Sequence, residues 1–252
     1  MMPISLLRIL VLIFLVTSFV GVVTGSNSLI AVPAMFQFGI APRAAVATNM
    51  FALVFMAIGG TSPFLRKGSI DVRKISPLLI LTAISSAIGA ALVGLITDQS
   101  IKLIVSVAMI LVAVFILVKR ESGVDQTGEI SRKALILTFI LTFLLGIYGG
   151  LYSGGYVTVL TATLVAFFGM NFSEAVASTK LINVVSSTIA TIVFMWQGLV
   201  DYSLGIILGV TMFVGAYIGA HYATKLNDIW LKRIFLTTVF VLALKTLYDF
   251  IK

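Results

Sequence analysis

The stretch Tyr148–Asn183 combines a strongly hydrophobic background with several residues that break helices. It opens with four glycines in eight residues, continues with hydroxyl side chains, and ends in a segment that carries Lys180. A broken helix in lipid leaves amide and carbonyl groups that nothing outside the protein can bond. Such a break persists only where protein or a water-filled cavity surrounds it, and a lysine inside a membrane helix is costly unless it is used. The stretch therefore predicts a polar site inside a membrane domain.

The composition places the whole chain in the membrane. Hydrophobic residues make up 60% and charged residues 10% of the 252 residues, whereas a soluble domain carries about 25% charged residues. Several apolar runs of about 20 residues are each long enough to cross a hydrocarbon core of about 30 Å. We therefore expect an all-α integral membrane protein in which residues 1–252 form a single transmembrane domain.

The scarcity of polar and titratable residues excludes several classes of function. The chain has no cysteine and one histidine, so thiol chemistry is excluded and neither a metal site nor a cofactor is expected. The net charge of +8 lies in short loops, which suits lipid headgroups better than nucleic acid. No P-loop occurs, so ATP is not expected to drive an activity. The expected partners are the lipid bilayer and a small solute, and a homo-oligomer remains open.

The second half of the chain repeats the first at a constant shift of 130 residues. Phe38-Gly39, followed five residues later by Ala-Val-Ala-Thr, returns as Phe168-Gly169 followed by Ala-Val-Ala-Ser. Shared composition alone would scatter such matches over many shifts, so the constant shift indicates internal duplication. We assign 1–118 to the first repeat, 119–133 to a linker and 134–252 to the second repeat, with about four hydrophobic segments in each. The same shift relates Gly25 to Gly155, Gly68 to Gly198, Asp71 to Asp201, Gly89 to Gly219 and Asp98 to Asp228.

Equivalent loops of the two repeats carry different charges. The loop at 66–74 holds four cations, whereas its copy at 196–204 has none. At the next pair of loops the bias is reversed, because three cations lie near Asp228 and one near Asp98. Short cationic loops stay in the cytoplasm, so equivalent loops are predicted on opposite sides of the membrane. The chain is therefore predicted to be an inverted-topology repeat with a cytoplasmic linker, a plan that many secondary transporters share.

Each repeat begins with a long apolar run, a break and a short apolar piece. In the first repeat Leu6–Val23 ends at the break Thr24–Ser28, and the next piece, Leu29–Phe38, has ten residues. Ten residues give about 15 Å of helix, or half a membrane, so we favour a re-entrant hairpin with its tip near the midplane. Two complete crossings are the alternative. Either arrangement places both termini on the periplasmic or extracellular side of an inner membrane.

These motifs resemble the sulfite exporter TauE/SafE family. Members have two halves, each with a glycine-rich run, a short apolar piece, a glycine turn and an Ala-Val-[AG]-[TS] motif. The matching residues are Gly25-Ser26, Gly39 and Ala45–Asn49 in the first half, and Gly149–Gly155, Gly169 and Ala175–Thr179 in the second. The first run departs from the family at Ser26 and Asn27, where glycines are usual. The resemblance covers about Phe19 to Leu247 and implies a transporter, often of sulfite, sulfonates or sulfoacetate.

An anion site is predicted between the two breaks. Half-helices that start at Asn27 and near Gly155 would direct N-terminal amides and the positive end of the helix dipole at the midplane, where both attract anions. Gly154 and Gly155 are expected at a turn with positive φ. Lys180 and Asn183 share a helix face, and the alternative for Lys180 is a side chain that extends to the headgroups. The candidate substrate-binding residues are Ser26, Asn27, Thr48, Asn49, Ser153, Gly154, Gly155, Ser178, Thr179, Lys180 and Asn183.

The function that we expect is secondary transport or export of small anions by alternating access around this midplane site. The alternative is a membrane-embedded enzyme or assembly factor without transport activity. An enzyme needs a nucleophile with its base, or metal ligands, and the sequence has no Ser–His–Asp arrangement and no acidic cluster in a span. No catalytic residue is therefore predicted. Gly215 and Gly219 are expected to serve close helix packing, which is the alternative role for Gly89 and Gly94.

Overall fold

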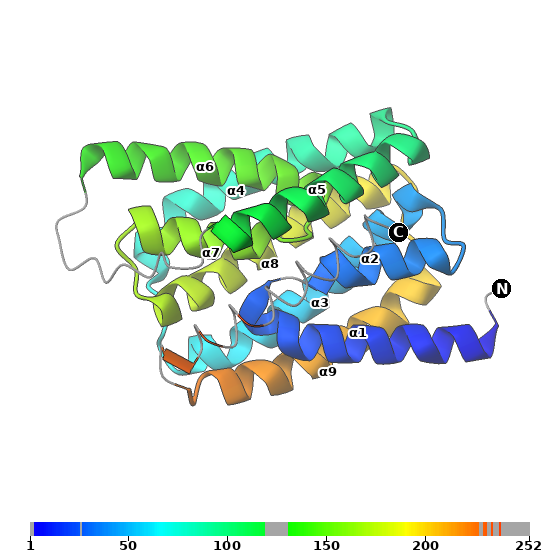
Figure 1. The fold of residues 1–252 in the computed structure, drawn as a ribbon, viewed down its shortest axis with the longest axis horizontal. Coiled ribbons are helices and arrows are strands. Elements are labelled where there is room, and N and C mark those ends of the chain that lie inside the picture. Colours follow the sequence, from blue (N-terminus) through cyan, green and yellow to red (C-terminus); the bar gives the residue numbers. More distant parts are fainter. Residues whose placement is uncertain are drawn as a thin grey trace.

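The computed structural model describes residues 3–25, 27–118 and 131–226, together with Ile229, Trp230, Arg233 and Thr237. These residues fold into helices without any β-strand (Figure 1), which confirms the predicted all-α class. The helices in the described chain are α1 (Ile4–Thr24), α2 (Asn27–Gln37), α3 (Pro42–Arg66), α4 (Val72–Leu95), α5 (Asp98–Val118), α6 (Arg132–Leu151), α7 (Tyr156–Phe167), α8 (Phe172–Trp196) and α9 (Tyr202–Ala223).

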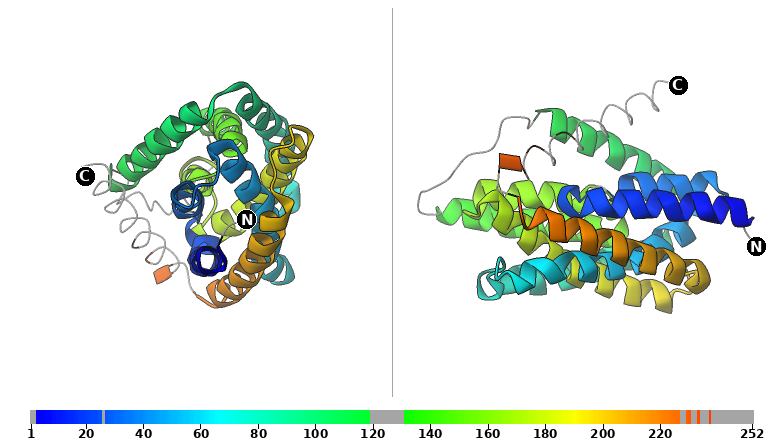
Figure 2. Two further views of the ribbon diagram at one scale, coloured as in Figure 1. Left: turned by 90° about the vertical axis from the view of Figure 1, so that its right-hand side faces the viewer. Right: turned by 90° about the horizontal axis from the view of Figure 1, so that it is seen from below.

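Six of the described helices are long and apolar enough to cross a membrane, namely α1, α3, α4, α6, α8 and α9. Of these, α3 and α8 are the most deeply buried. They pack against each other, with α9 on α3 and α4 on α8. The outer helices also cross between the halves, because α1 packs on α9 and α6 packs on α4. Figure 2 shows the resulting bundle from its end and from below.

Two helical hairpins, α1–α2 and α6–α7, each consist of a long arm and a short arm. Their long arms, α1 and α6, have 21 and 20 residues, and their short arms, α2 and α7, have 11 and 12. At 1.5 Å per residue a short arm measures about 16–18 Å, which cannot cross a core of about 30 Å. The short arms are therefore too short for a second complete crossing, whereas α1 and α6 are each long enough to span. The α1–α2 hairpin enters from the end of the bundle that carries the N-terminus, and the α6–α7 hairpin enters from the opposite end (Figure 1).

The backbone conformation repeats at the shift seen in the sequence. Every described residue with a positive φ is a glycine, because glycine reaches this region without a steric cost. The six glycines form three pairs separated by 130 residues: Gly25 and Gly155, Gly39 and Gly169, Gly68 and Gly198. The two halves thus share their turns, while their orientation across a bilayer stays a prediction.

The helix starts repeat as well. Asp71 and Asp201 stand at the N-caps of α4 and α9, and each carboxylate accepts a hydrogen bond from the backbone amide three residues further on, at 3.1 and 3.0 Å. Such a cap satisfies an amide that the first turn leaves open. The Gly-x-x-Asp motif is therefore a turn followed by a helix cap in both halves.

Glycines allow close contact between helices, as expected for Gly215 and Gly219 and as the alternative role held for Gly89. A β-carbon on Gly89 of α4 would overlap the backbone of α6 at Ile147, and one on Gly219 of α9 would overlap the backbone of α1 at Phe19. Gly215 lies against α1 in the same way. The absence of side chains allows α1 and α6 to lie directly on α9 and α4.

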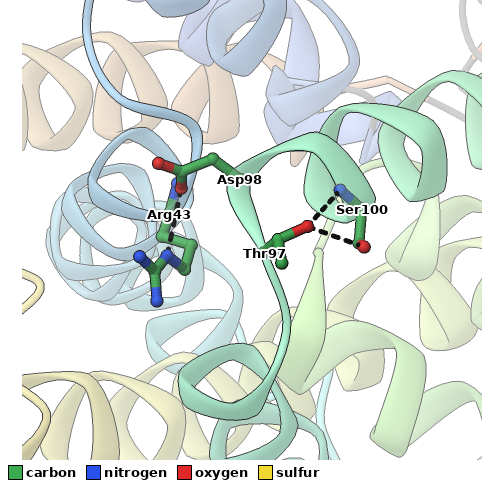
Figure 3. Close-up of polar contacts among 4 residues, drawn as sticks. All are labelled: Arg43, Thr97, Asp98 and Ser100. Carbon is green, nitrogen blue, oxygen red and sulfur yellow. Dashed lines mark hydrogen bonds and ion pairs between the residues drawn. The ribbon is translucent and has the colours of Figure 1, made fainter.

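An ion pair joins the start of α5 to the start of α3. Asp98 Oδ1 lies 3.1 Å from Arg43 Nε and accepts from the Arg43 backbone amide at 3.0 Å (Figure 3). Beside it, Thr97 Oγ1 accepts from the Ser100 amide at 3.2 Å. The two charged side chains are 37% and 42% exposed, so the pair contributes less than about 1 kcal/mol and mainly sets where α5 begins.

Some predicted features lie outside the described residues. They are Ser26, residues 119–130 of the linker, and most of the chain after 226, including Asp228. The boundaries of the two repeats at 1–118 and 134–252 stay predictions.

Candidate functional site

The tips of the two hairpins meet inside the bundle. Ser28, the second residue of α2, has its Oγ 2.8 Å from the Oγ of Ser153, which lies in the turn between α6 and α7. Asn49 of α3 donates from Nδ2 to Ser28 Oγ at 2.9 Å. All three side chains are buried. These residues, Ser28, Asn49 and Ser153, are termed the tip contact, and they join both hairpins to the central helix α3.

Hydroxyl groups of the second hairpin bond carbonyls at the break of the first. Thr158 Oγ1 donates to the Thr24 carbonyl at 2.6 Å, and the Tyr152 hydroxyl donates to the Ser28 carbonyl at 3.0 Å. The Tyr148 hydroxyl donates to a carbonyl in the turn of its own hairpin. Carbonyls in a membrane interior must be bonded within the protein. The hydroxyl-rich sequence after the glycines therefore explains how both breaks persist away from water.

Gly25 and Gly155 form the sharp turns, with φ of 71° and 78°. Gly25 also faces the second hairpin, because a β-carbon on it would lie 2.5 Å from Val157 Cβ. Gly154 differs from the expectation, since its φ is not positive. It is a glycine for reasons of space, because the ring of Tyr152 packs directly on it.

Lys180 is the one charged side chain that is buried among the residues that the structure describes, at 3% exposure. Its Nζ lies 3.5 Å from the Gly21 carbonyl of α1, a long hydrogen bond. Its Cδ lies 4.0 Å from where a β-carbon on Gly60 of α3 would stand. No described carboxylate forms an ion pair with it. The side chain therefore runs into the space between α8, α1 and α3 and does not extend to the headgroups.

Asn27, the first residue of α2, is a second buried polar residue whose side chain lacks a hydrogen-bond partner among the described residues. Its side chain is 3% exposed, and neither Oδ1 nor Nδ2 has a hydrogen-bond partner among the described residues. Its Cβ lies 3.0 Å from where a β-carbon on Gly21 would stand, so it lies against the turn of α1 that Lys180 contacts. An unbonded buried amide costs about 1–3 kcal/mol. The first amides of α2 and the positive end of its dipole add to this local preference for negative charge.

The other predicted site residues have different surroundings. Thr48 Oγ1 accepts from a backbone amide of the α8–α9 turn at 3.0 Å, which holds it away from the hairpin tips. Thr179 makes a 3.1 Å hydroxyl contact with α7. Ser178 and Asn183 are buried on α8, at 1% and 7% exposure. The structure thus groups Asn27, Asn49, Ser153 and Lys180 around the α1–α2 break, and it places Thr48 elsewhere.

Three residues at the meeting point are absent from the predicted set, namely Ser28, Tyr152 and Thr158. A signal for two of them exists in the sequence. Ser28 and Thr158 are separated by 130 residues, so a hydroxyl occupies the same position in both short arms. Because the tips meet, each of these hydroxyls reaches the opposite hairpin.

The site offers hydrogen-bond donors and one ammonium group. In the part of the chain that the structure describes, no group of His, Cys, Asp and Glu residues could hold a metal ion. Six spanning-length helices in the described chain, two of which fold back into short arms around a polar site at a helix break, are the arrangement of a multi-pass membrane transporter.

The chain belongs to the sulfite exporter TauE/SafE family, whose sequence model matches residues 10–246. A "Probable membrane transporter protein ORF9" of Sinorhizobium is 26% identical to this chain, over 97% of it and 93% of the relative's length. A "Probable membrane transporter protein" of Haemophilus influenzae is 25% identical over 98% and 96%. "Probable membrane transporter protein YfcA" of Escherichia coli K12 is 23% identical over 97% and 90%. No solved structure matches the chain.

Family and relatives agree on the class of function. The match covers nearly the whole chain, and each relative is described as a membrane transporter. The chain is therefore a membrane transporter and not an enzyme.

Proposed function

We propose that the chain transports small sulfur-containing or organic anions by alternating access around a site formed by Lys180, Asn27 and the tip contact. The observation that carries this proposal is the buried Lys180 ammonium, which has one long hydrogen bond and no ion pair among the described residues. An uncompensated charge at membrane depth is costly and marks a path for a substrate or ion. A bound anion supplies the missing charge.

The neutral hydrogen-bond donors around Lys180 suit the binding of an anion with several oxygen atoms. The Asn27 amide, the first amides of α2 and the hydroxyls of the tip contact are all able to donate. No carboxylate stands among these described groups to repel an anion. Oxygen atoms that share a negative charge accept stronger hydrogen bonds than neutral acceptors. Sulfite and sulfonate groups have this chemistry, and the family name, sulfite exporter, points the same way.

The balance of charge favours a singly charged anion. One buried cation faces the site in the described chain, so a monoanion forms a neutral pair with it. A dianion would leave one charge uncompensated in a low-dielectric interior, at an effective cost of several kcal/mol. Hydrogen sulfite and monosulfonates should therefore bind better than sulfate or sulfoacetate.

The hairpin tips suit a site that opens and closes. The tip contact and the two carbonyl bonds beside it are individual hydrogen bonds between neutral groups. Each contributes about 0.5–1.5 kcal/mol, so the tips are able to separate without unfolding the bundle. The absence of a P-loop in the sequence supports secondary transport.

The membrane and the orientation of the chain in it are part of the same proposal. The cationic loops at 66–74 and 225–233 lie in the cytoplasm, both termini lie outside, and the membrane is the inner membrane of the cell.

Binding by the purified protein tests the proposal. Thermal unfolding would be followed with methanesulfonate and hydrogen sulfite, with sulfate and sulfoacetate as dianions, and with zwitterionic taurine. The monoanions should raise the melting temperature at lower concentration than the dianions. A protein that responds to none of these anions would contradict the anion proposal. Equal responses to monoanions and dianions would contradict only the proposed preference for singly charged anions.

A further inference from the structure

A second polar cluster lies between α4, α6, α7 and α8, on the other side of α8 from α1. It is termed the hydroxyl cluster, and its members are Thr82, Ser86, Thr142, Tyr156 and Ser186, each at most 1% exposed. The Ser86 Oγ lies 2.7 Å from the Ser186 Oγ and donates to the Gly146 carbonyl at 3.2 Å. Serine side chains thereby connect α4 to α8 and to α6.

Tyr156 enters the cluster from the first turn of α7. Its ring packs on α6, where a β-carbon on Gly149 would lie 2.8 Å from the Tyr156 Cγ. Its hydroxyl lies toward the hydroxyls of Thr82 and Ser186 but forms no hydrogen bond of normal geometry with any described residue. Thr142 lies one turn before Gly146 on α6, and the missing side chain of Gly146 brings that face onto α4 beside Thr82. Hydroxyl groups of α4, α7 and α8 therefore lie together, and Thr142 lies on the adjoining face of α6.

The threonines of the cluster differ from others in these helices. Thr138, Thr161 and Thr163 donate to the carbonyl four residues earlier, at 2.8–2.9 Å, which satisfies the hydroxyl within its own helix. Thr82 and Thr142 make no such bond, and their fully buried hydroxyls have no partner among the described residues. An unbonded buried hydroxyl is destabilising. The unbonded hydroxyls of Thr82 and Tyr156 within the cluster, with that of Thr142 on the adjoining helix, indicate a place for a ligand.

The donor set defines the class of this ligand. The side chains of the cluster present oxygen atoms only, without nitrogen or charge, and hard cations prefer oxygen ligands. The last carbonyls of α6 and the negative end of its dipole lie nearby, because α6 ends at Leu151, two residues after Gly149, on which Tyr156 packs. A divalent ion would lack a carboxylate to balance its charge. The dipoles of the hydroxyl and carbonyl groups suffice to balance the single charge of a monovalent cation. We propose that the hydroxyl cluster binds Na⁺.

The cluster is placed to sense the anion site. Ser186 and Lys180 are six residues apart on α8, about 9 Å along the helix axis. The coupling between this cation site and the anion site rests on the proposed function. The Lys180 ammonium opposes a cation at this distance, and an anion bound to Lys180 removes the repulsion. Na⁺ and anion should then raise each other's affinity by the same factor, which we expect to be roughly tenfold.

Titration of the purified protein with sodium gluconate tests the site, with potassium and choline gluconate as controls for ionic strength. Na⁺ should raise the melting temperature at concentrations where K⁺ and choline have no effect, and methanesulfonate should lower the Na⁺ concentration required. A wild-type protein without a Na⁺-specific response would overturn the proposal and assign the cluster to a buried water. A Na⁺ response that anions do not change would overturn the coupling. A missing anion response beside an intact Na⁺ response would count against the proposed function alone.

Nearly isosteric variants locate the response. Thr82→Val and Ser186→Ala should each weaken the Na⁺ response at least tenfold while the protein still binds methanesulfonate in Na⁺-free buffer. Thr61→Val is the matched control, because Thr61 is also buried and without a described partner but lies on α3, outside the cluster. Equal losses in Thr61→Val and Thr82→Val would contradict the assignment.

Discussion

The two hairpins and the helices around them share a backbone but differ in chemistry. Gly25 and Gly155 turn in the same conformation, and a hydroxyl follows each break in the short arm. The residues that surround the turns are not shared. At the shift of 130 residues, Thr82 corresponds to Met212, Ser86 to Ala216, Ser186 to Met56, Lys180 to Met50 and Asn27 to Val157.

This difference separates what builds the fold from what builds the site. Positions that the backbone requires, such as glycines with positive φ and aspartate caps, are the same in both halves. Positions that only line the interior have diverged. The first hairpin carries Asn27, whose side chain has no partner among the described residues, and lies beside Lys180 of α8, whereas the second hairpin places Tyr156 among the hydroxyls of α4 and α8. Under our two proposals, the same duplicated backbone would therefore carry an anion site near one hairpin and a Na⁺ site near the other.

The largest expected effect concerns the orientation of the two halves. The chain has no cysteine, so single cysteines at Ser69 and Ser203 are readily labelled. Their turns lie at opposite ends of the bundle (Figure 1), and an impermeant reagent should label Ser203→Cys from outside and Ser69→Cys only after permeabilisation. Labelling of both from one side would refute the inverted orientation of the halves.

The next largest effect is expected when Lys180 is replaced by methionine, the residue at the equivalent position 50 of the first repeat. Lys180→Met should weaken monoanion binding by about 1.5–3 kcal/mol, or roughly ten- to hundredfold, because a charge-assisted interaction is lost. The melting temperature without ligand should stay equal or rise, since an unpaired buried charge is removed. Lys180→Arg should also impair transport, because a planar guanidinium does not replace a compact ammonium. Wild-type affinity and proteoliposome flux in Lys180→Met would remove Lys180 from the site.

A smaller effect distinguishes turn geometry from contact between the hairpins. Gly25 and Gly39 both have positive φ, but a β-carbon on Gly39 meets nothing within 4 Å, whereas one on Gly25 would overlap Val157. Gly39→Ala should cost about 1–2 kcal/mol of unfolding free energy from strain alone. Gly25→Ala should cost about 1–3 kcal/mol more because of overpacking. Similar losses in the two variants, measured by denaturant unfolding in detergent, would show that the tips are not tightly packed.

The smallest effect concerns the tip contact itself. Ser28 Oγ bonds both Ser153 and Asn49, while Ser153 makes one of these two bonds. Ser28→Ala should therefore destabilise the protein by about 1 kcal/mol more than Ser153→Ala, the net worth of one hydrogen bond. The double variant should lose no more than Ser28→Ala alone. Additive losses would mean that the two serines do not interact.

Part of this arrangement is predictable because it depends on local residue types. Apolar length specifies the spans, and the glycine and hydroxyl run at 149–158 identifies a break. The ten-residue piece after the first break predicts a half-length arm, and α2 has 11 residues. The wrong expectation for Gly154 has a clear cause. Its need for space comes from the Tyr152 ring that folds over it, which spacing alone does not reveal.

By itself the sequence determined the membrane class, the repeat, the positions of the breaks and the presence of a lysine in a span. These follow from transfer energies and backbone preferences that act over a few residues. Only the tertiary structure decided that Ser28 meets Ser153, that Thr48 bonds the α8–α9 turn, and that hydroxyls of α4 and α8 lie beside Tyr156 of α7. Such contacts join residues from distant parts of the chain. Their formation depends on how helices pack and on which buried groups find partners, and neither is specified by any single segment.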